Sequence, residues 1–326
     1  MAALLSLGLL IGGCGGEEDT AGGADGDGID LVTYSALESV YGEALEPAFQ
    51  ETFLEEVGFE NSFGVSAEQS QAVAEGAPAS IVHFEQAGDM ERLVDEGKVD
   101  PSWDERPYNG IAYNTVVVFV VRKGNPLQIQ SLDDILGGKV DVVTPNPLGS
   151  DAGRWNVMAA YGTLIEEGKS EAEALAGVKA LLEQAVAQPS SATDALAAFL
   201  QGEGDVLIAY ESDAIRAVEE AKGVHFVVPH ETILVQTPIA VTAEAPKPAA
   251  EDFLEFLWSE DGQLIWAENG YRPVNRLLVN QERFFPREAF RIDRFGGWAK
   301  VNDEFFDPET GSIAEIEREL GVPASE

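Results

Sequence analysis

Four serines stand where a strand pattern ends and a helix pattern begins, and their positions suit them to anion binding. The N–H groups of the first helical turn have no partner within the helix, and the helix dipole adds partial positive charge there. Helix N-termini therefore bind sulfate, phosphate and carboxylate groups. A hydroxyl at such a start accepts from its own helix and still has a proton to donate to a ligand. The four serines are Ser35, Ser66, Ser150 and Ser191.

Three of these helix starts also have the spacing of a capping box, in which an acid or amide follows the serine by three residues. The pairs are Ser35 with Glu38, Ser66 with Gln69 and Ser191 with Asp194. The fourth serine closes a Pro- and Gly-rich turn within "TPNPLGSDAGRWN", residues 144–156. A single N-cap serine ordinarily stabilises only its own helix, by about 1 kcal/mol. Four such starts in one chain favour a shared ligand.

The charge balance restricts the partners of such a site. The chain of 326 residues carries 58 acidic and 20 basic residues, for a net charge of -38. Its field repels nucleic acids and anionic lipid headgroups, so we expect no nucleic acid as a partner. An anion would have to be held by neutral donors and helix dipoles, because the sequence contains no basic patch.

Patterns typical of enzymes are missing from the sequence. His83, His225 and His230 are far apart and do not form a metal-binding spacing such as HExxH. The chain has neither a GxSxG nucleophile elbow nor a GxxxxGK[ST] phosphate loop. We therefore expect no catalytic residue, no metal and no cofactor. A structural or adhesive protein is a third class, but it leaves the serine helix starts unexplained.

The elements that must position the serines alternate between strand and helix patterns. Most strand candidates are continuous β-branched runs, typical of parallel strands buried on both faces. They cover residues 29–34, 79–84, 114–121, 139–144, 204–210, 224–229 and 237–242. Helix patterns lie between them, which predicts an α/β fold. In such a sheet the helix N-termini gather at the carboxyl ends of the strands, where ligands bind.

The N-terminal residues resemble a bacterial lipoprotein signal. A short apolar segment ends in "IGGC", an aliphatic residue and two small residues before Cys14, although no Lys or Arg precedes it. The segment is too short to span a bilayer. We interpret residues 1–14 as a signal peptide ending at lipidated Cys14, and 15–28 as a disordered acidic, Gly-rich linker. Since Cys14 is the single cysteine, no disulfide is expected.

The motifs resemble those of one family, the bacterial periplasmic sulfate- and thiosulfate-binding proteins. The stretch "TPNPLGSDAGRWNVMAAYG" is similar to the family motif "NPKTSGGARWN", and "GVSAEQSQAV" is similar to "GGSGKQ". The likeness continues in the same order through "VVVFVVRKGNP", "GDVLIAYESDAI", "NGYRPVN", "FGGWAKVNDEFF" and "GSIAEIERELG". It covers nearly the whole chain, from Ile29 to about Gly321.

The resemblance implies a two-lobe type II periplasmic-binding-protein fold, each lobe a central mostly parallel sheet flanked by helices. We expect residues 29–115 with 238–326 to form lobe 1 and residues 116–237 to form lobe 2. Carried over by position, the ligand contacts are the backbone amides of Ser35, Asp151, Ala152 and Ser191, the hydroxyls of Ser66 and Ser150, and the ring of Tyr210. Arg154 matches the arginine of the motif and is expected to form an ion pair near the site or between the lobes.

Three of the motifs depart from the family pattern. Asp151 and Ala152 replace two glycines after Ser150, Tyr210 replaces a tryptophan, and Glu68 replaces a lysine. Sulfate offers only acceptors, so a carboxylate that faced it would repel it, whereas a protonated oxyanion would donate to that carboxylate. We expect Asp151 to point to solvent in the first helical turn, where an acid favours the dipole. The alternative is that it contacts the ligand.

These observations predict an extracytoplasmic, periplasmic or cell-surface solute-binding lipoprotein. It is expected to be a monomer that captures sulfate or thiosulfate and delivers it to the permease of an ABC importer, touching the membrane only through its lipid anchor. The alternative is a different oxyanion such as phosphate or molybdate.

Overall fold

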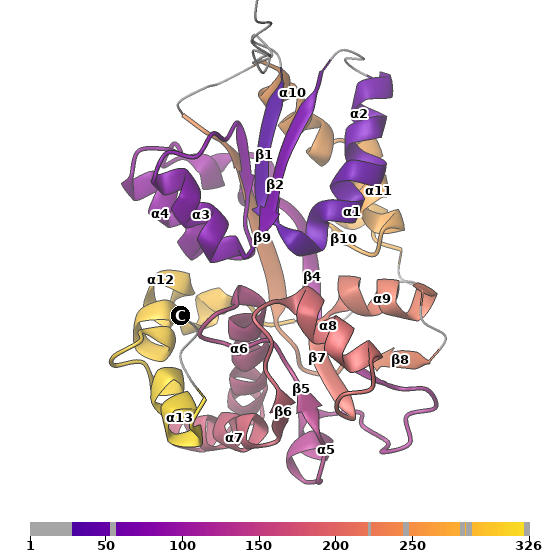
Figure 1. The fold of residues 1–326 in the computed structure, drawn as a ribbon, viewed down its shortest axis with the longest axis vertical. Helices are drawn as coiled ribbons and strands as arrows, with labels where there is room; N and C mark the ends of the chain where they lie inside the picture. Colours follow the sequence, from indigo (N-terminus) through magenta and orange to yellow (C-terminus); the bar gives the residue numbers. More distant parts are fainter. Residues whose placement is uncertain are drawn as a thin grey trace, which may run out of the picture.

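The protein consists of two α/β lobes joined by two long strands (Figure 1). A computed structural model describes residues 28–52, 57–220, 223–243, 248–280, 284 and 289–322. The signal peptide, Cys14 and residues 15–27 of the expected linker lie outside these ranges. No helix in the described ranges is long and apolar enough to cross a membrane.

Lobe 1 is built on three parallel strands, in the order β2 (Phe59–Gly64), β1 (Ile29–Tyr34), β3 (Ile81–His83). The antiparallel strand β9 (Leu234–Val241) continues this sheet beside β3. Short helical turns η1 (Ser35–Leu37), α1 (Glu38–Val40) and η2 (Tyr41–Leu45) follow β1 and lead into α2 (Glu46–Thr52). The other helices are α3 (Ser66–Ala74), α4 (Ala87–Asp95), α10 (Pro248–Trp258) and α11 (Glu260–Glu268).

Lobe 2 repeats the arrangement with the parallel strands β6 (Ala185–Ala187), β5 (Val142–Val143) and β7 (Val206–Tyr210). Strand β4 (Ile111–Arg122) is antiparallel to β7, and it also pairs with β8 (Val224–Val227) and β10 (Arg272–Pro273). The helices are α5 (Leu132–Leu136), α6 (Asp151–Glu166), α7 (Glu171–Glu183), α8 (Ala192–Leu200) and α9 (Glu211–Glu220). Each lobe thus has a mostly parallel sheet flanked by helices, which confirms the predicted fold class.

Strands β4 and β9 connect the lobes and pair with each other along the way. The valine-rich half of β4 is apolar at every position because both of its faces are buried. Val117, Phe119 and Val121 pack in one hydrophobic cluster, whereas Val116 and Val118 pack in a different one on the opposite face. A strand that is buried on both faces needs no polar alternation.

The C-terminal helices differ from the expected lobe division. The elements α12 (Gly297–Val301), η7 (Asn302–Phe306) and α13 (Ser312–Leu320) contribute apolar side chains to the hydrophobic cluster of lobe 2 (Figure 1). Helix α13 packs on α7, whereas α12 also contacts α4 of lobe 1. Trp298 and Ile313 belong to the same hydrophobic cluster as Trp155 and Leu181 of lobe 2. The apolar faces of these helices require a partner surface, and the sequence did not indicate which lobe supplies it. Residues 292–320 therefore belong to lobe 2 by packing.

Candidate functional site

Three of the four predicted serines line one small cavity between the lobes. Ser35, Ser150 and Ser191 surround a volume of ≈ 10 Å³, together with Tyr34 and Glu85. Each serine follows the carboxyl end of a parallel strand: β1 in lobe 1, and β5 and β6 in lobe 2. The cavity therefore lies where the carboxyl edges of two sheets meet, as expected for a ligand site of an α/β fold. Its volume is that of about one water molecule.

None of the three predicted capping boxes forms in full, and only at Ser191 does the serine cap its helix. Ser35 and Ser66 are the first residues of their helices rather than N-caps, because Tyr34 and Val65 hold the extended N-cap conformation. Ser191 does cap α8, and it accepts a hydrogen bond from the Asp194 N–H at 3.1 Å. The capping-box predictions at Ser35 and Ser66 are therefore wrong.

Ser66 lies beside the cavity and supports it through hydrogen bonds. Its hydroxyl donates to the Asp89 carboxylate at 2.8 Å and accepts from the Glu85 N–H at 3.0 Å. The side chain is fully buried. In this conformation the single hydroxyl proton of Ser66 is committed to Asp89, so Ser66 orients the segment that carries Glu85.

The turn before Ser150 is held by its own side chains. The Asn146 side-chain oxygen accepts hydrogen bonds from the backbone N–H groups of Leu148, at 2.8 Å, and Gly149, at 3.2 Å. Ser150 is the N-cap of α6, yet its hydroxyl makes no capping bond. Gly153 lies directly under the turn, where a Cβ would come within 2.6 Å of the Pro145 carbonyl oxygen. The turn thus presents Ser150 with its hydroxyl unused by the helix.

Asp151 is buried, and the expectation that it points to solvent is wrong. Only 1% of its surface is exposed. One carboxylate oxygen accepts a hydrogen bond from the Gln86 side-chain amide of lobe 1 and lies 3.7 Å from Arg154. The other oxygen has no hydrogen-bond partner among the described residues. The reason is tertiary, because the N-terminus of α6 faces the opposite lobe rather than water.

Gln86, Arg154 and Asn302 extend this contact into an interlobe network. Arg154 donates to the Asn302 side chain at 3.1 Å, and Asn302 donates to the Gln86 side chain at 3.0 Å. Beside it, the Trp155 indole N–H donates to the backbone carbonyl of Glu85 at 2.9 Å. Gln86 and Glu85 come from lobe 1, whereas the other three side chains are packed in lobe 2. Arg154 therefore contacts residues of lobe 2, and it is linked to lobe 1 through Asp151 and Asn302, whose hydrogen bonds with Gln86 join the lobes.

Tyr210 and Ala152 line a second cavity of ≈ 10 Å³ next to the first, with Ala192 between them. The Tyr210 hydroxyl is buried and has no partner at hydrogen-bonding geometry among the described residues. Burial raises its pKa well above the usual value, and the neighbouring carboxylates of Glu85 and Asp151 raise it further. Tyr210 is thus a neutral phenol whose nearest acceptor is the Glu85 carboxylate.

The structure also reveals buried carboxylates that the sequence analysis missed. Burial, followed by the charge of Asp151, raises the pKa values of Glu85 and Asp89 well above the normal range. Burial also raises the pKa of Asp213, although Arg216 opposes this shift. The sequence did contain a signal for the three aspartates. Residues 89, 151 and 213 each follow a strand and are each followed three residues later by an arginine.

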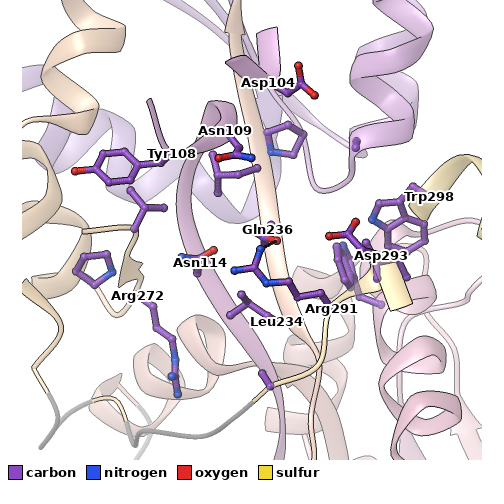
Figure 2. A pocket seen from close by; sticks show the side chains of 18 of the residues that line it. Asp104, Tyr108, Asn109, Asn114, Leu234, Gln236, Arg272, Arg291, Asp293 and Trp298 are labelled. Atoms are coloured by element: carbon purple, nitrogen blue, oxygen red, sulfur yellow. Dashed lines mark hydrogen bonds between the residues drawn. The ribbon is translucent and has the colours of Figure 1, made fainter. Parts of the chain in front are cut away.

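A much larger cavity lies elsewhere, against the connecting strands. It has a volume of ≈ 750 Å³, and Figure 2 shows Asn114 of β4 and Gln236 of β9 among the residues that line it. None of the predicted contact residues lines this cavity. Its Arg272 is already neutralised by Glu211, at 2.5 and 2.9 Å. The smaller serine-lined cavity is the candidate anion site, because the starts of η1, α6 and α8 meet there.

The histidines have ordinary structural surroundings. His83 is buried beside the Tyr41 hydroxyl, at 2.8 Å, and burial lowers its pKa to about 3. His230 is exposed and lies next to Glu231. Within the described ranges, no cluster of three His, Cys, Asp or Glu side chains is arranged to bind a metal ion.

Comparison with known proteins places the chain in a family. Residues 29–272 match the family described as bacterial extracellular solute-binding protein. The sulfate-binding protein of Salmonella typhimurium is 35% identical over 292 residues, covering 84% of this chain and 88% of the relative. The thiosulfate-binding protein of Pseudomonas aeruginosa is 31% identical over 322 residues, covering 94% of each chain.

The solved structure of the sulfate-binding protein SubI from Mycobacterium tuberculosis H37Rv is also similar. It superimposes with a TM-score of 0.81 at 36% identity, covering 86% of this chain and 100% of the other. The match therefore extends over both lobes. The chain belongs to the bacterial extracellular solute-binding proteins, in the family of the sulfate- and thiosulfate-binding proteins.

Proposed function

We propose that this protein captures sulfate or thiosulfate between its lobes and delivers it to the permease of an ABC importer. The observation that carries the proposal is the cavity where Ser35, Ser150 and Ser191 meet at strand ends from both lobes. The names of the relatives support the choice of ligand. They do not favour phosphate or molybdate, the alternative raised by the sequence.

The anion is held by neutral donors. The proposed contacts are the backbone amides of Ser35, Asp151, Ala152 and Ser191, the hydroxyls of Ser66 and Ser150, and the Tyr210 hydroxyl. A hydrogen bond to a charged group contributes about 1.5–3 kcal/mol. About six such bonds are enough for the roughly 8 kcal/mol of micromolar binding after the costs of desolvation and ordering. The Ser66 hydroxyl must turn away from Asp89 to take part.

Binding is coupled to movement of the lobes. The cavity of ≈ 10 Å³ has room for about one water molecule, so a tetrahedral anion needs the lobes further apart than they are in this structure. The lobes therefore part to admit the anion and close on it. The interlobe hydrogen bonds of Gln86 and Trp155 stabilise the closed form. The protein acts by binding and closure, as a monomer without catalysis, and is anchored outside the cytoplasm by a lipid on Cys14.

Calorimetric titration of the purified protein, dialysed free of sulfate, tests the ligand. We expect micromolar binding of sulfate or thiosulfate, with one anion bound per chain. Phosphate and molybdate are the comparison ligands in the same chloride buffer, and they should release little or no heat. Binding of phosphate or molybdate alone, or of none of the four anions, would contradict the proposed ligand.

A further inference from the structure

Four buried carboxylates meet where the lobes close, and one of them differs from the rest. Asp89, Asp151 and Asp213 each have an arginine three residues later on the same helix. The shortest distances are 3.2 Å to Arg92, 3.7 Å to Arg154 and 2.8 Å to Arg216. Among the described residues, no cation forms an ion pair with the fourth carboxylate, Glu85.

The backbone of Glu85 is held at the wall of the serine-lined cavity. Its N–H donates to the Ser66 hydroxyl, and its carbonyl accepts from the Trp155 indole. Glu85 lines the cavity with Ser35, Ser150 and Ser191, and only 6% of the residue is exposed. Its carboxylate interacts with Asp151 and Tyr210, so an anion bound in the cavity would lie close to it.

The groups around Glu85 do not neutralise it. Six ionisable groups from six different strands and helices interact with its carboxylate. They are Tyr34 of β1, Asp89 of α4, Tyr113 of β4, Asp151 of α6, Tyr210 of β7 and Asp213 of α9. All six are carboxylates or neutral phenols, and the arginines nearby are already paired with the aspartates. An ionised Glu85 would repel a dianion in this enclosed site. A protonated Glu85 would be neutral and would offer one more O–H donor.

Sulfate and thiosulfate carry no proton at neutral pH. The proton that removes the repulsion between the anion and Glu85 must therefore be bound by the protein. We propose that Glu85 takes up one proton from solvent as the lobes close on the anion, so that anion and proton are captured together. This inference rests on the proposed function.

Burial and the charge of Asp151 raise the pKa of Glu85 in the closed structure. In the open form water reaches the side chain and its pKa falls. Between these two pKa values binding takes up a proton, so affinity decreases as pH rises, by at most tenfold per pH unit.

Proton uptake is measured by titrating sulfate and thiosulfate into the full chain in bis-Tris and in Tris, two chloride buffers that differ in ionisation enthalpy. Between pH 6 and 8 we expect the heat to differ between the buffers, by an amount that approaches one proton per anion. The dissociation constant should rise over the same range. Glu85→Gln should bind with no difference between the buffers and with a flat pH profile. Glu68→Gln, an exposed glutamate on α3, is the matched control and should behave like the wild type.

The wild-type titration decides the matter even if Glu85→Gln folds poorly. If sulfate or thiosulfate binds without buffer-dependent heat and with the same affinity at pH 6 and 8, the inference is overturned while the proposed function stands. Retained proton uptake in folded Glu85→Gln would also overturn it, because another group would then hold the proton. If the wild type binds neither anion at any pH, the proposed function fails, and this inference fails with it.

Discussion

The serines show how the surroundings of one residue decide its use. Ser170 and Ser131 lie at exposed helix starts and form reciprocal capping boxes with Glu173 and Asp134. Ser150 occupies the same N-cap position on α6, but its hydroxyl makes no capping bond. It lines the interlobe cavity instead. The capping hydrogen bond from the serine side chain to its own helix therefore distinguishes the two kinds of serine. It is present where the serine stabilises its helix, and it is absent where the hydroxyl is available to a ligand.

This difference predicts opposite effects of two equivalent substitutions. Ser150→Ala should weaken sulfate or thiosulfate binding by more than about 1 kcal/mol, because a donor to a charged ligand is lost. It should change the free energy of unfolding little, since no capping bond is broken. Ser170→Ala, the matched control, should cost about 1 kcal/mol of stability and leave affinity unchanged. Calorimetry and urea unfolding measure the two quantities, and wild-type affinity in Ser150→Ala would refute the assignment of this serine.

At the scale of elements, the site depends on how closely α6 approaches the turn that precedes it. The Asn156 side chain donates to Thr144 at 3.1 Å and to the Ile208 carbonyl of β7 at 2.9 Å, which ties α6 to the ends of two strands. Gly153 allows the turn to cross over the first helical turn, because it has no Cβ. The N-terminus of α6 is thereby aimed at the opposite lobe.

Gly153→Ala should therefore disturb both the fold and the site. The new Cβ would lie 2.6 Å from the Pro145 carbonyl oxygen and 2.7 Å from that of Asn146, so backbone must move. We expect a loss of about 1–3 kcal/mol in the free energy of unfolding and weaker anion binding. In Gly42→Ala the Cβ meets nothing within 4 Å, so this exposed helical position should be neutral or gain up to about 1 kcal/mol. Equal urea midpoints for the two variants would contradict the predicted clash between a Cβ at position 153 and the backbone of the turn.

At the scale of the whole molecule, the charge shapes both the ligand site and the relation to the membrane. A net charge of -38 opposes the approach of any anion, so the site has to bind through short-range hydrogen bonds and helix ends. The same charge repels anionic lipid headgroups. Electrostatic attraction therefore does not hold this protein at such a membrane, which is consistent with the proposed lipid on Cys14 as its anchor.

Replacement of Cys14, the proposed site of lipidation, tests this reasoning. In a bacterial host that processes lipoproteins, Cys14→Ser should move the protein from the membrane fraction to the soluble extracytoplasmic fraction. Wild-type protein should stay with the membrane in high salt, because lipid insertion is not screened by ions. An unchanged distribution of Cys14→Ser, or release of the wild type by salt, would contradict lipid anchoring. Sulfate affinity serves as the control and should be the same for both proteins.

The sequence by itself determined the α/β order of the chain and the family. The buried strand β7 is apolar along its whole length, and β1 departs from this pattern only at Asp30 and Thr33. The turn before Ser150 is rich in proline and glycine, so strands and turn are both local signals. Strand β2 was not predicted because Glu60, Asn61 and Ser62 are exposed at the edge of the sheet. An edge strand with polar side chains has no hydrophobic pattern to detect.

Only the tertiary structure decided which side chains meet at the site. Asp151 has the local pattern of a solvent-exposed acid at a helix start, and it is buried because lobe 1 covers it. Its partner Gln86 is 65 residues away in sequence, and Asn302 lies 216 residues beyond Gln86. The surroundings of Glu85 are likewise assembled from several strands and helices of both lobes. No local pattern encodes such contacts, because they arise from how the hydrophobic faces of the two lobes pack and close.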